Sequence, residues 1–113
     1  MNIEELRTFC LSMPAVTEDI KWEDNLVFSV GGKMFCLADL KPPLRVSFKV
    51  PPDRFAELTE MPGIGQAPYF ARGIWVMVSD ESAMSRDEWN HCIRESYELV
   101  KEKLPKKVRD SIG

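Results

Sequence analysis

Residues 44–50, Leu-Arg-Val-Ser-Phe-Lys-Val, alternate apolar and polar side chains without interruption. Successive side chains of a β-strand point to opposite faces of a sheet, so this pattern predicts a strand with one apolar and one basic face. The apolar face has to be covered by other parts of the chain, whereas Arg45, Ser47 and Lys49 share the outer face. The segment therefore predicts a sheet that is covered on one side.

Further strand patterns lie on both sides of this segment. Leu26–Val30 and Met34–Ala38 are separated by Gly31-Gly32, which is typical of a β-hairpin. Ile74–Val78 is a nearly continuous apolar run and is predicted to be another strand. The acidic stretch Thr17–Asp24 is predicted to be a connection anchored by Trp22, and residues 68–73 a loop or edge segment.

Three segments are predicted to be helices, and the first and last of them follow a capping-box pattern, Asn2 with Glu5 and Ser85 with Glu88. The predicted helices cover residues 3–12, 54–60 and 86–103. The core stripe of the last helix has one polar member, Ser96, and consists of Trp89, Cys92, Ile93, Ser96, Val100 and Leu104. The basic segment after Pro105 is expected to be a frayed, solvated terminus.

This order of elements predicts a single α+β domain over residues 1–113. Short hairpin connections require an antiparallel sheet, and the helices have to cover its apolar face. We therefore expect a two-layer sandwich, with a sheet of about four to five strands and the N- and C-terminal helices on one face.

Composition excludes several classes of protein. The chain has 113 residues, of which 44% are hydrophobic, and a net charge of −3. It is too apolar for disorder, and its apolar residues are too dispersed for a membrane span or a signal peptide. Its three cysteines are far apart, which favours reduced, buried thiols and a cytoplasmic location.

No catalytic or metal-binding pattern is found in the sequence. The single histidine, His91, lies off the core stripe and is interpreted as a solvated surface residue. The cysteines lack the spacing of metal ligands, and the glycine pairs lack that of a phosphate-binding loop. We therefore expect a protein that is not an enzyme and has no cofactor.

The outer face of the sheet is the candidate site. If Ile74, Val76 and Val78 pack inward, Trp75 and Met77 lie on the same side as Arg45 and Lys49. Basic and aromatic residues together can follow a phosphate backbone and stack on bases. The alternative is that the basic residues only keep this face soluble, with the tryptophan covered by the loop before it or buried in the other register.

The chain resembles the MmcQ/YjbR family of small bacterial proteins along nearly its whole length. The resemblance is carried by residues 6–11 with 13–18, 32–35, 46–49, the strand around Trp75, and 96–100. It implies an antiparallel α+β fold described as CyaY-like or secretion-chaperone-like, and DNA binding by a "double wing" of strands. Where many members have histidines, this chain has Tyr69-Phe70 and Ile74-Trp75.

Two functions follow as hypotheses, both for a binding module without a membrane partner. The first is DNA binding, as the resemblance implies, and its candidate contact residues are Lys33, Arg45, Lys49, Arg72 and Trp75. The second is a protein-interaction adaptor that uses an exposed aromatic patch of Tyr69, Phe70, Trp75 and Met77.

Overall fold

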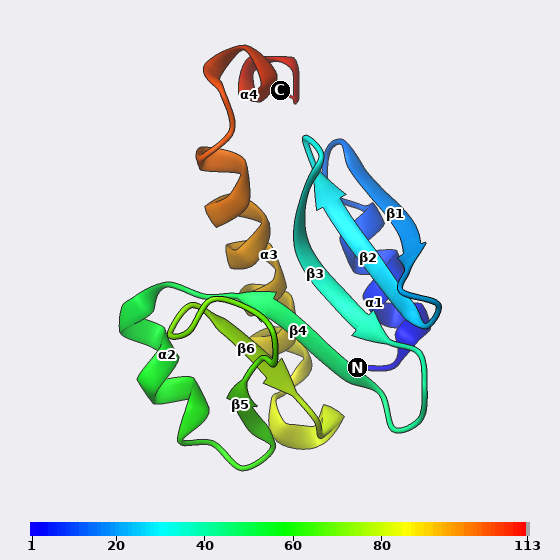
Figure 1. Cartoon of the computed structure of the whole chain (residues 1–113), viewed down its shortest axis with the longest axis vertical. Helices are drawn as coiled ribbons and strands as arrows, with labels where there is room; N and C mark the ends of the chain where they lie inside the picture. The colour runs from blue at the N-terminus through cyan, green and yellow to red at the C-terminus, as the bar shows by residue number, and fades with distance from the viewer. Residues whose placement is uncertain (113) are drawn as a thin grey trace.

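The computed structural model describes residues 1–112, which form one antiparallel sheet with helices packed on one side. The strands are β1 (Val16–Lys21), β2 (Asn25–Val30), β3 (Lys33–Asp39), β4 (Arg45–Lys49), β5 (Ile64–Gln66) and β6 (Trp75–Val78). The helices are α1 (Ile3–Leu11), α2 (Pro52–Thr59), α3 (Arg86–Glu102), α4 (Lys106–Ile112) and the short 3₁₀ helix η1 (Glu81–Ala83). In Figure 1 the sheet faces the viewer, with α1 and α3 behind it.

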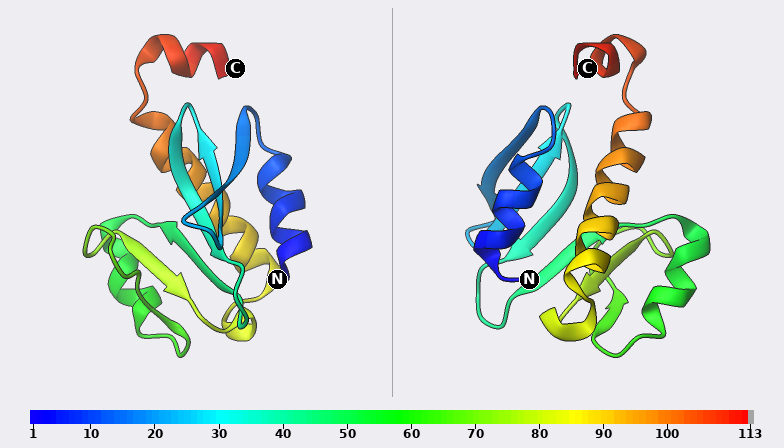
Figure 2. Two further views of the ribbon diagram at one scale, coloured as in Figure 1. Left: turned by 45° about the vertical axis from the view of Figure 1, so that its right-hand side comes forward. Right: turned by 180° about the vertical axis from the view of Figure 1, so that it is seen from behind.

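The predicted α+β class and the helices on one face are confirmed. The strand order is β1-β2-β3-β4-β6-β5, so in residues 1–112 the sheet has six strands rather than four to five. Apolar residues of α1, α2 and α3 share one core with the inward face of the strands. The right-hand view of Figure 2 shows α1 and α3 on this same side.

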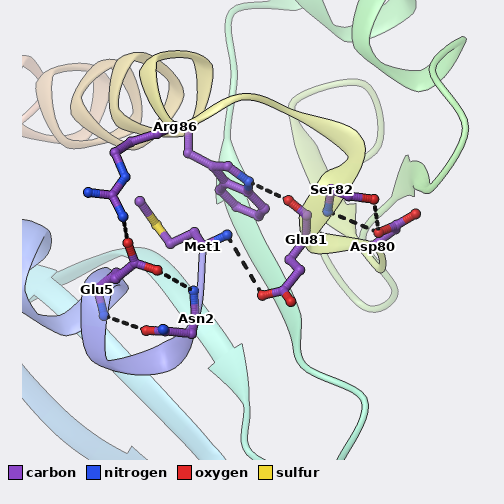
Figure 3. A network of polar contacts seen from close by, with 8 residues as sticks. Met1, Asn2, Glu5, Asp80, Glu81, Ser82 and Arg86 are labelled. Carbon is purple, nitrogen blue, oxygen red and sulfur yellow. Dashed lines mark hydrogen bonds and ion pairs between the residues drawn. The ribbon is translucent and has the colours of Figure 1, made fainter.

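Both predicted capping boxes are present, and the first belongs to a polar network between α1 and α3. The Asn2 side chain accepts a hydrogen bond from the Glu5 N–H, and the Glu5 carboxylate accepts one from the Asn2 N–H. Glu5 also pairs with Arg86, and the amino group of Met1 lies 3.7 Å from Glu81 (Figure 3). These contacts join the first turns of helices that are far apart in the sequence.

The predicted hairpin between β2 and β3 is confirmed. Gly31 and Gly32 both have positive φ, 58° and 80°, as the two-residue turn requires. Farther along, the register shifts so that Phe28 faces Cys36 and Ser29 faces Met34, which leaves Phe35 as an extra residue. This bulge turns Phe35 and Cys36 toward the same core.

The strand β3 separates from β4 beyond the pair Cys36–Phe48. At this point α3 supplies a polar bridge, because the Ser96 hydroxyl donates to the Phe35 carbonyl at 2.6 Å and accepts from the Lys49 N–H at 2.9 Å. In Figure 1 the two strands diverge toward the end of the sheet, and α3 passes behind them. The hydroxyl of Ser96 therefore links β3 and β4 where the direct hydrogen bonds between the two strands have ended.

The prediction for residues 17–24 was wrong, and one short strand was not anticipated. Thr17–Asp24 is not a connection, because Val16–Lys21 forms β1 and pairs with β2. Edge strand β1 is exposed over most of its length, so it lacks the alternation by which strands are found. The three-residue edge strand β5 is too short for such a pattern to show.

The basic tail is also not a frayed terminus, because it forms α4. Pro105 ends α3, but its carbonyl accepts hydrogen bonds from the N–H groups of Val108 and Arg109 and so begins a new helix. Val108 packs against the main core, close to Gly31 at the tip of the β2–β3 hairpin. A tertiary contact with the hairpin therefore stabilises a helix that is too short to be stable alone.

None of the helices in residues 1–112 combines the length and the hydropathy needed to cross a lipid bilayer.

Candidate functional site

The outer face of the sheet carries a second, smaller core. Val27, Leu37, Ala67 and Trp75 are buried there, on the side away from the helices. Trp75 is on the outer face as predicted, because its neighbour Val76 points into the main core. Phe70 stacks on Trp75 with ring centroids 4.5 Å apart, so the loop covers the tryptophan and leaves it 8% exposed.

The loop over this face, residues 67–73, is held by the side chain of Gln66. The amide nitrogen of Gln66 donates to the carbonyl oxygens of Ala67 at 2.8 Å and Phe70 at 3.4 Å, and the amide oxygen accepts from the Gly73 N–H at 3.0 Å. The Ala67 N–H donates to the Trp75 carbonyl. The loop is therefore tied to β6 at its start and to β5 at its end, and the residue that follows it, Ile74, packs against the second core rather than inward as predicted.

Next to this loop the outer face is hollowed into a groove of about 820 Å³. Met34, Leu37 and Met77 contribute to its apolar lining, while Trp22 and Tyr69 lie at its rim. Trp22 reaches the groove from the turn between β1 and β2, and Tyr69 from the loop. We call this feature the outer groove.

Trp22 and Tyr69 are unusual in both exposure and backbone conformation. Trp22 is 66% exposed and Tyr69 is fully exposed, although aromatic side chains are normally covered. Their φ angles are 51° and 68°, and in residues 1–112 only two other non-glycine residues have positive φ. Such conformations cost about 1–3 kcal/mol each and are concentrated at functional sites. The two aromatic residues are thus held in strained backbone at the rim of an apolar groove.

The charged residues of the outer groove neutralise one another. Arg45 pairs with Asp39 at 2.5 Å, and the Lys41 N–H also donates to the Asp39 carboxylate. The Lys41 N–H, together with the nearby Arg45 guanidinium, lowers the pKa of Asp39. Asp39 therefore stays ionised opposite Arg45, and the groove lacks the excess positive charge that the sequence pattern predicts.

Comparison with protein-family models assigns the chain to a family. The family model described as YjbR matches residues 11–99. The chain belongs to the YjbR family. This agrees with the resemblance seen in the sequence, and no curated protein matches the chain.

Two solved structures are similar to this YjbR-family chain. The Deinococcus radiodurans protein DR2400, with the domain DUF419, is 30% identical, with a TM-score of 0.91 over 99% of this chain and 88% of its own. A protein from Pseudomonas syringae is 22% identical, with a TM-score of 0.76 over 88% of this chain and 99% of its own. The second shows the same fold.

The structure does not gather the predicted contact residues of this YjbR-family protein into one patch. Arg45 lines the outer groove, but Lys49 is at the far end of β4, about 13 Å along the strand. Lys33 pairs with Val30, a residue of the main core, so it lies on the opposite face. Arg72 is exposed on the loop, and Trp75 is buried beneath it.

Sequence reasoning missed three residues that shape the outer groove. Trp22 lies in a turn between Lys21 and Glu23. A large aromatic residue among charged neighbours is the sequence feature that could have indicated an exposed contact residue. Gln66 holds the loop, and Asp39 pairs with Arg45. No local sequence pattern indicates such contacts between separate segments.

The histidine and the three cysteines of this YjbR-family chain lie outside the lining of the outer groove. His91 is exposed, as predicted, and faces Glu95 at 3.9 Å. Cys10, Cys36 and Cys92 are all buried, and burial raises the pKa of Cys36 and Cys92, so these two thiols stay protonated. Residues 1–112 contain no group of three or more side chains placed to hold a metal ion.

Proposed function

We propose that this YjbR-family protein is a non-enzymatic binding module that takes an apolar segment of a partner protein into the outer groove. The observation that carries the proposal is the exposure of Trp22 and Tyr69 in strained backbone on the groove rim. Exposed aromatic residues are the usual anchors of protein interfaces. The strain is explained if a bound segment covers both rings.

The lining of the outer groove supports a peptide as its ligand. Met34 and Met77 give it a flexible, polarisable surface, which adapts to apolar side chains of different shape. Its volume of about 820 Å³ lies within the ordinary range of ligand sites. The neutralised pair of Arg45 and Asp39 leaves polar atoms to orient a peptide backbone without favouring a strongly charged partner.

Peptide selection would test this proposal. Peptides selected from a random display library on the intact protein are expected to be apolar, and Trp22→Ala or Tyr69→Ala should weaken their binding about tenfold or more. Leu11→Ala is the matched control, because Leu11 is also exposed and lies at the end of α1. Equal binding by the Trp22→Ala and Leu11→Ala variants would contradict the proposal.

Single-stranded DNA is the second candidate ligand of this face. Exposed Trp22 and Tyr69 could stack on bases, and Arg72 lies on the neighbouring loop with no ion pair among the described residues. The net charge of −3 counts against many phosphate contacts.

Fluorescence anisotropy with labelled single- and double-stranded DNA at two salt concentrations would decide between the candidates. DNA binding on this face requires an affinity that falls with salt and is lost in Arg72→Glu and Trp22→Ala. Lys107→Glu changes the net charge equally, lies in α4 outside the groove lining, and is the control. Absence of binding at low salt would remove DNA as a candidate and leave the peptide.

A further inference from the structure

Ser47 of β4 lies in the floor of the outer groove, where β4 runs between β3 and β6. It is paired with Leu37 of β3 on one side and with Met77 of β6 on the other. Its neighbours along the strand, Val46 and Phe48, point into the main core, which places Ser47 on the outer face. A single hydroxyl therefore lies between two apolar side chains that also line the groove.

The hydroxyl of Ser47 has no hydrogen-bond partner within residues 1–112, although the residue is only 6% exposed. The other buried serine, Ser96, makes two hydrogen bonds. Buried hydroxyl groups are normally paired, because leaving water without a new partner costs free energy. The Ser47 hydroxyl is therefore available to a polar group that enters the groove.

A side chain of the ligand, rather than its main chain, is suited to reach this hydroxyl. A peptide that adds to a sheet as a strand pairs with an edge, and the edges of this sheet are β1 and β5. Strand β4 is in the interior, between β3 and β6 (Figure 1). A segment that crosses the outer face therefore contacts Trp22 and Tyr69 at the rim, and one of its side chains projects down to Ser47.

The lining of the outer groove favours a neutral side chain that is apolar along its length. Its charged residues, Arg45 and Asp39, pair with each other, so the lining has no net charge. A lysine or glutamate side chain would lose its hydration in the groove without gaining an opposite charge. Trp22, Tyr69 and Phe70 supply aromatic surface, against which another aromatic ring packs favourably.

We propose that the outer groove binds a tyrosine side chain of the partner segment, whose phenol hydroxyl forms a hydrogen bond with the Ser47 hydroxyl. This inference rests on the proposed function and names the anchor residue of the partner. The phenol oxygen is at the tip of the ring, so it reaches the floor while the ring contacts the apolar lining. Buried tyrosine hydroxyls usually have a partner, and tyrosine is a common anchor of protein interfaces. Ser47 is thus the residue that distinguishes tyrosine from phenylalanine.

NMR titration of the isotope-labelled full chain with N-acetyl-tyrosinamide, and separately with N-acetyl-phenylalaninamide, tests this site. Both probes should shift the amide signals of Leu37 and Met77, and the tyrosine probe should bind about three- to tenfold more tightly. Ser47→Ala should reduce this preference to less than about twofold without weakening the phenylalanine probe, because it removes the unpaired hydroxyl. Ser29→Ala, on the same face of β2 but outside the groove lining, is the matched control and should keep the preference.

The outcomes separate this inference from the proposed function. Equal affinity of the two probes for the groove overturns the tyrosine anchor but leaves a groove that binds apolar side chains. Absence of shifts at Leu37 and Met77 with either probe also overturns the anchor, and the library selection then decides the proposed function independently. Ser47→Ala should unfold at the same urea concentration as the wild type. A less stable variant would mean that the hydroxyl has a partner within the fold, which would overturn the inference.

Discussion

The hydroxyl of Ser96 in α3 lies 2.6 Å from the main-chain carbonyl oxygen of Phe35 in β3 and donates a hydrogen bond to it. The same oxygen accepts the N–H of Lys49 in β4, so one side chain joins two strands that have already parted. Ser96 is fully buried, and its position in the core stripe of α3 is explained by this bridge.

Ser96→Ala is expected to destabilise the protein by about 1–3 kcal/mol, because a buried carbonyl and a buried N–H would both lose their partner. The free energy of unfolding from urea titration measures the effect. Ser111→Ala is the control, since the Ser111 hydroxyl is exposed and only bonds within α4. Equal stability of the two variants would show that the bridge does not hold the strands.

Gly31→Ala is expected to destabilise the protein more than Gly32→Ala. Both positions have positive φ, for which an L-residue costs about 1–2 kcal/mol. An added Cβ at Gly31 would also lie 2.6 Å from Leu104, whereas Gly32 faces open space. The difference should appear in thermal unfolding, and Leu104→Ala in the Gly31→Ala background should restore part of it. Equal effects at the two glycines would argue against packing of the hairpin on Leu104.

Trp22→Asn is expected to raise the free energy of unfolding by about 1 kcal/mol, because asparagine tolerates the left-handed conformation. Trp22→Ala, which keeps the backbone penalty, is the control and should show no such gain. Urea titration of both variants provides the measurement. An Asn variant less stable than the Ala variant would mean that Trp22 stabilises the turn.

Asp39→Asn is expected to reduce stability at pH 7 and to have less effect at pH 3. The pKa of Asp39 in the folded protein lies below the ordinary value of about 3.9, so its ionised form stabilises the fold above that pH. This contribution is lost as the pH falls through the folded-state pKa. Urea titration of wild type and variant at both pH values measures the change, with exposed Asp110→Asn as control. A constant difference between the two pH values would contradict the role of the carboxylate.

Local sequence patterns were sufficient for the elements that carry their own signal. The glycine pair at residues 31 and 32 predicted the hairpin, the two capping boxes predicted the starts of α1 and α3, and the alternation in β4 predicted its outer face. These features depend on residues within a few positions of each other, so they can be predicted from turn residues and from the periodicity of a helix or strand.

The candidate site was predicted only in part. The position of Trp75 on the outer face follows from the period of β6, but its burial depends on Phe70 and on the loop that Gln66 holds. The predicted basic face contains Arg45, yet Asp39 on the neighbouring strand neutralises it. Both results depend on side chains from other segments, which the period of a single strand does not reveal.

The sequence by itself determined the α+β class, the hairpin, the capped helices and the two faces of β4, because all of these depend on short-range periodicity and turn chemistry. Only the tertiary structure decided that residues 16–21 form an edge strand, that the terminal segment folds as α4, and that Trp22 and Tyr69 line one groove. These features arise from contacts between distant segments, whose energies outweigh weak local preferences.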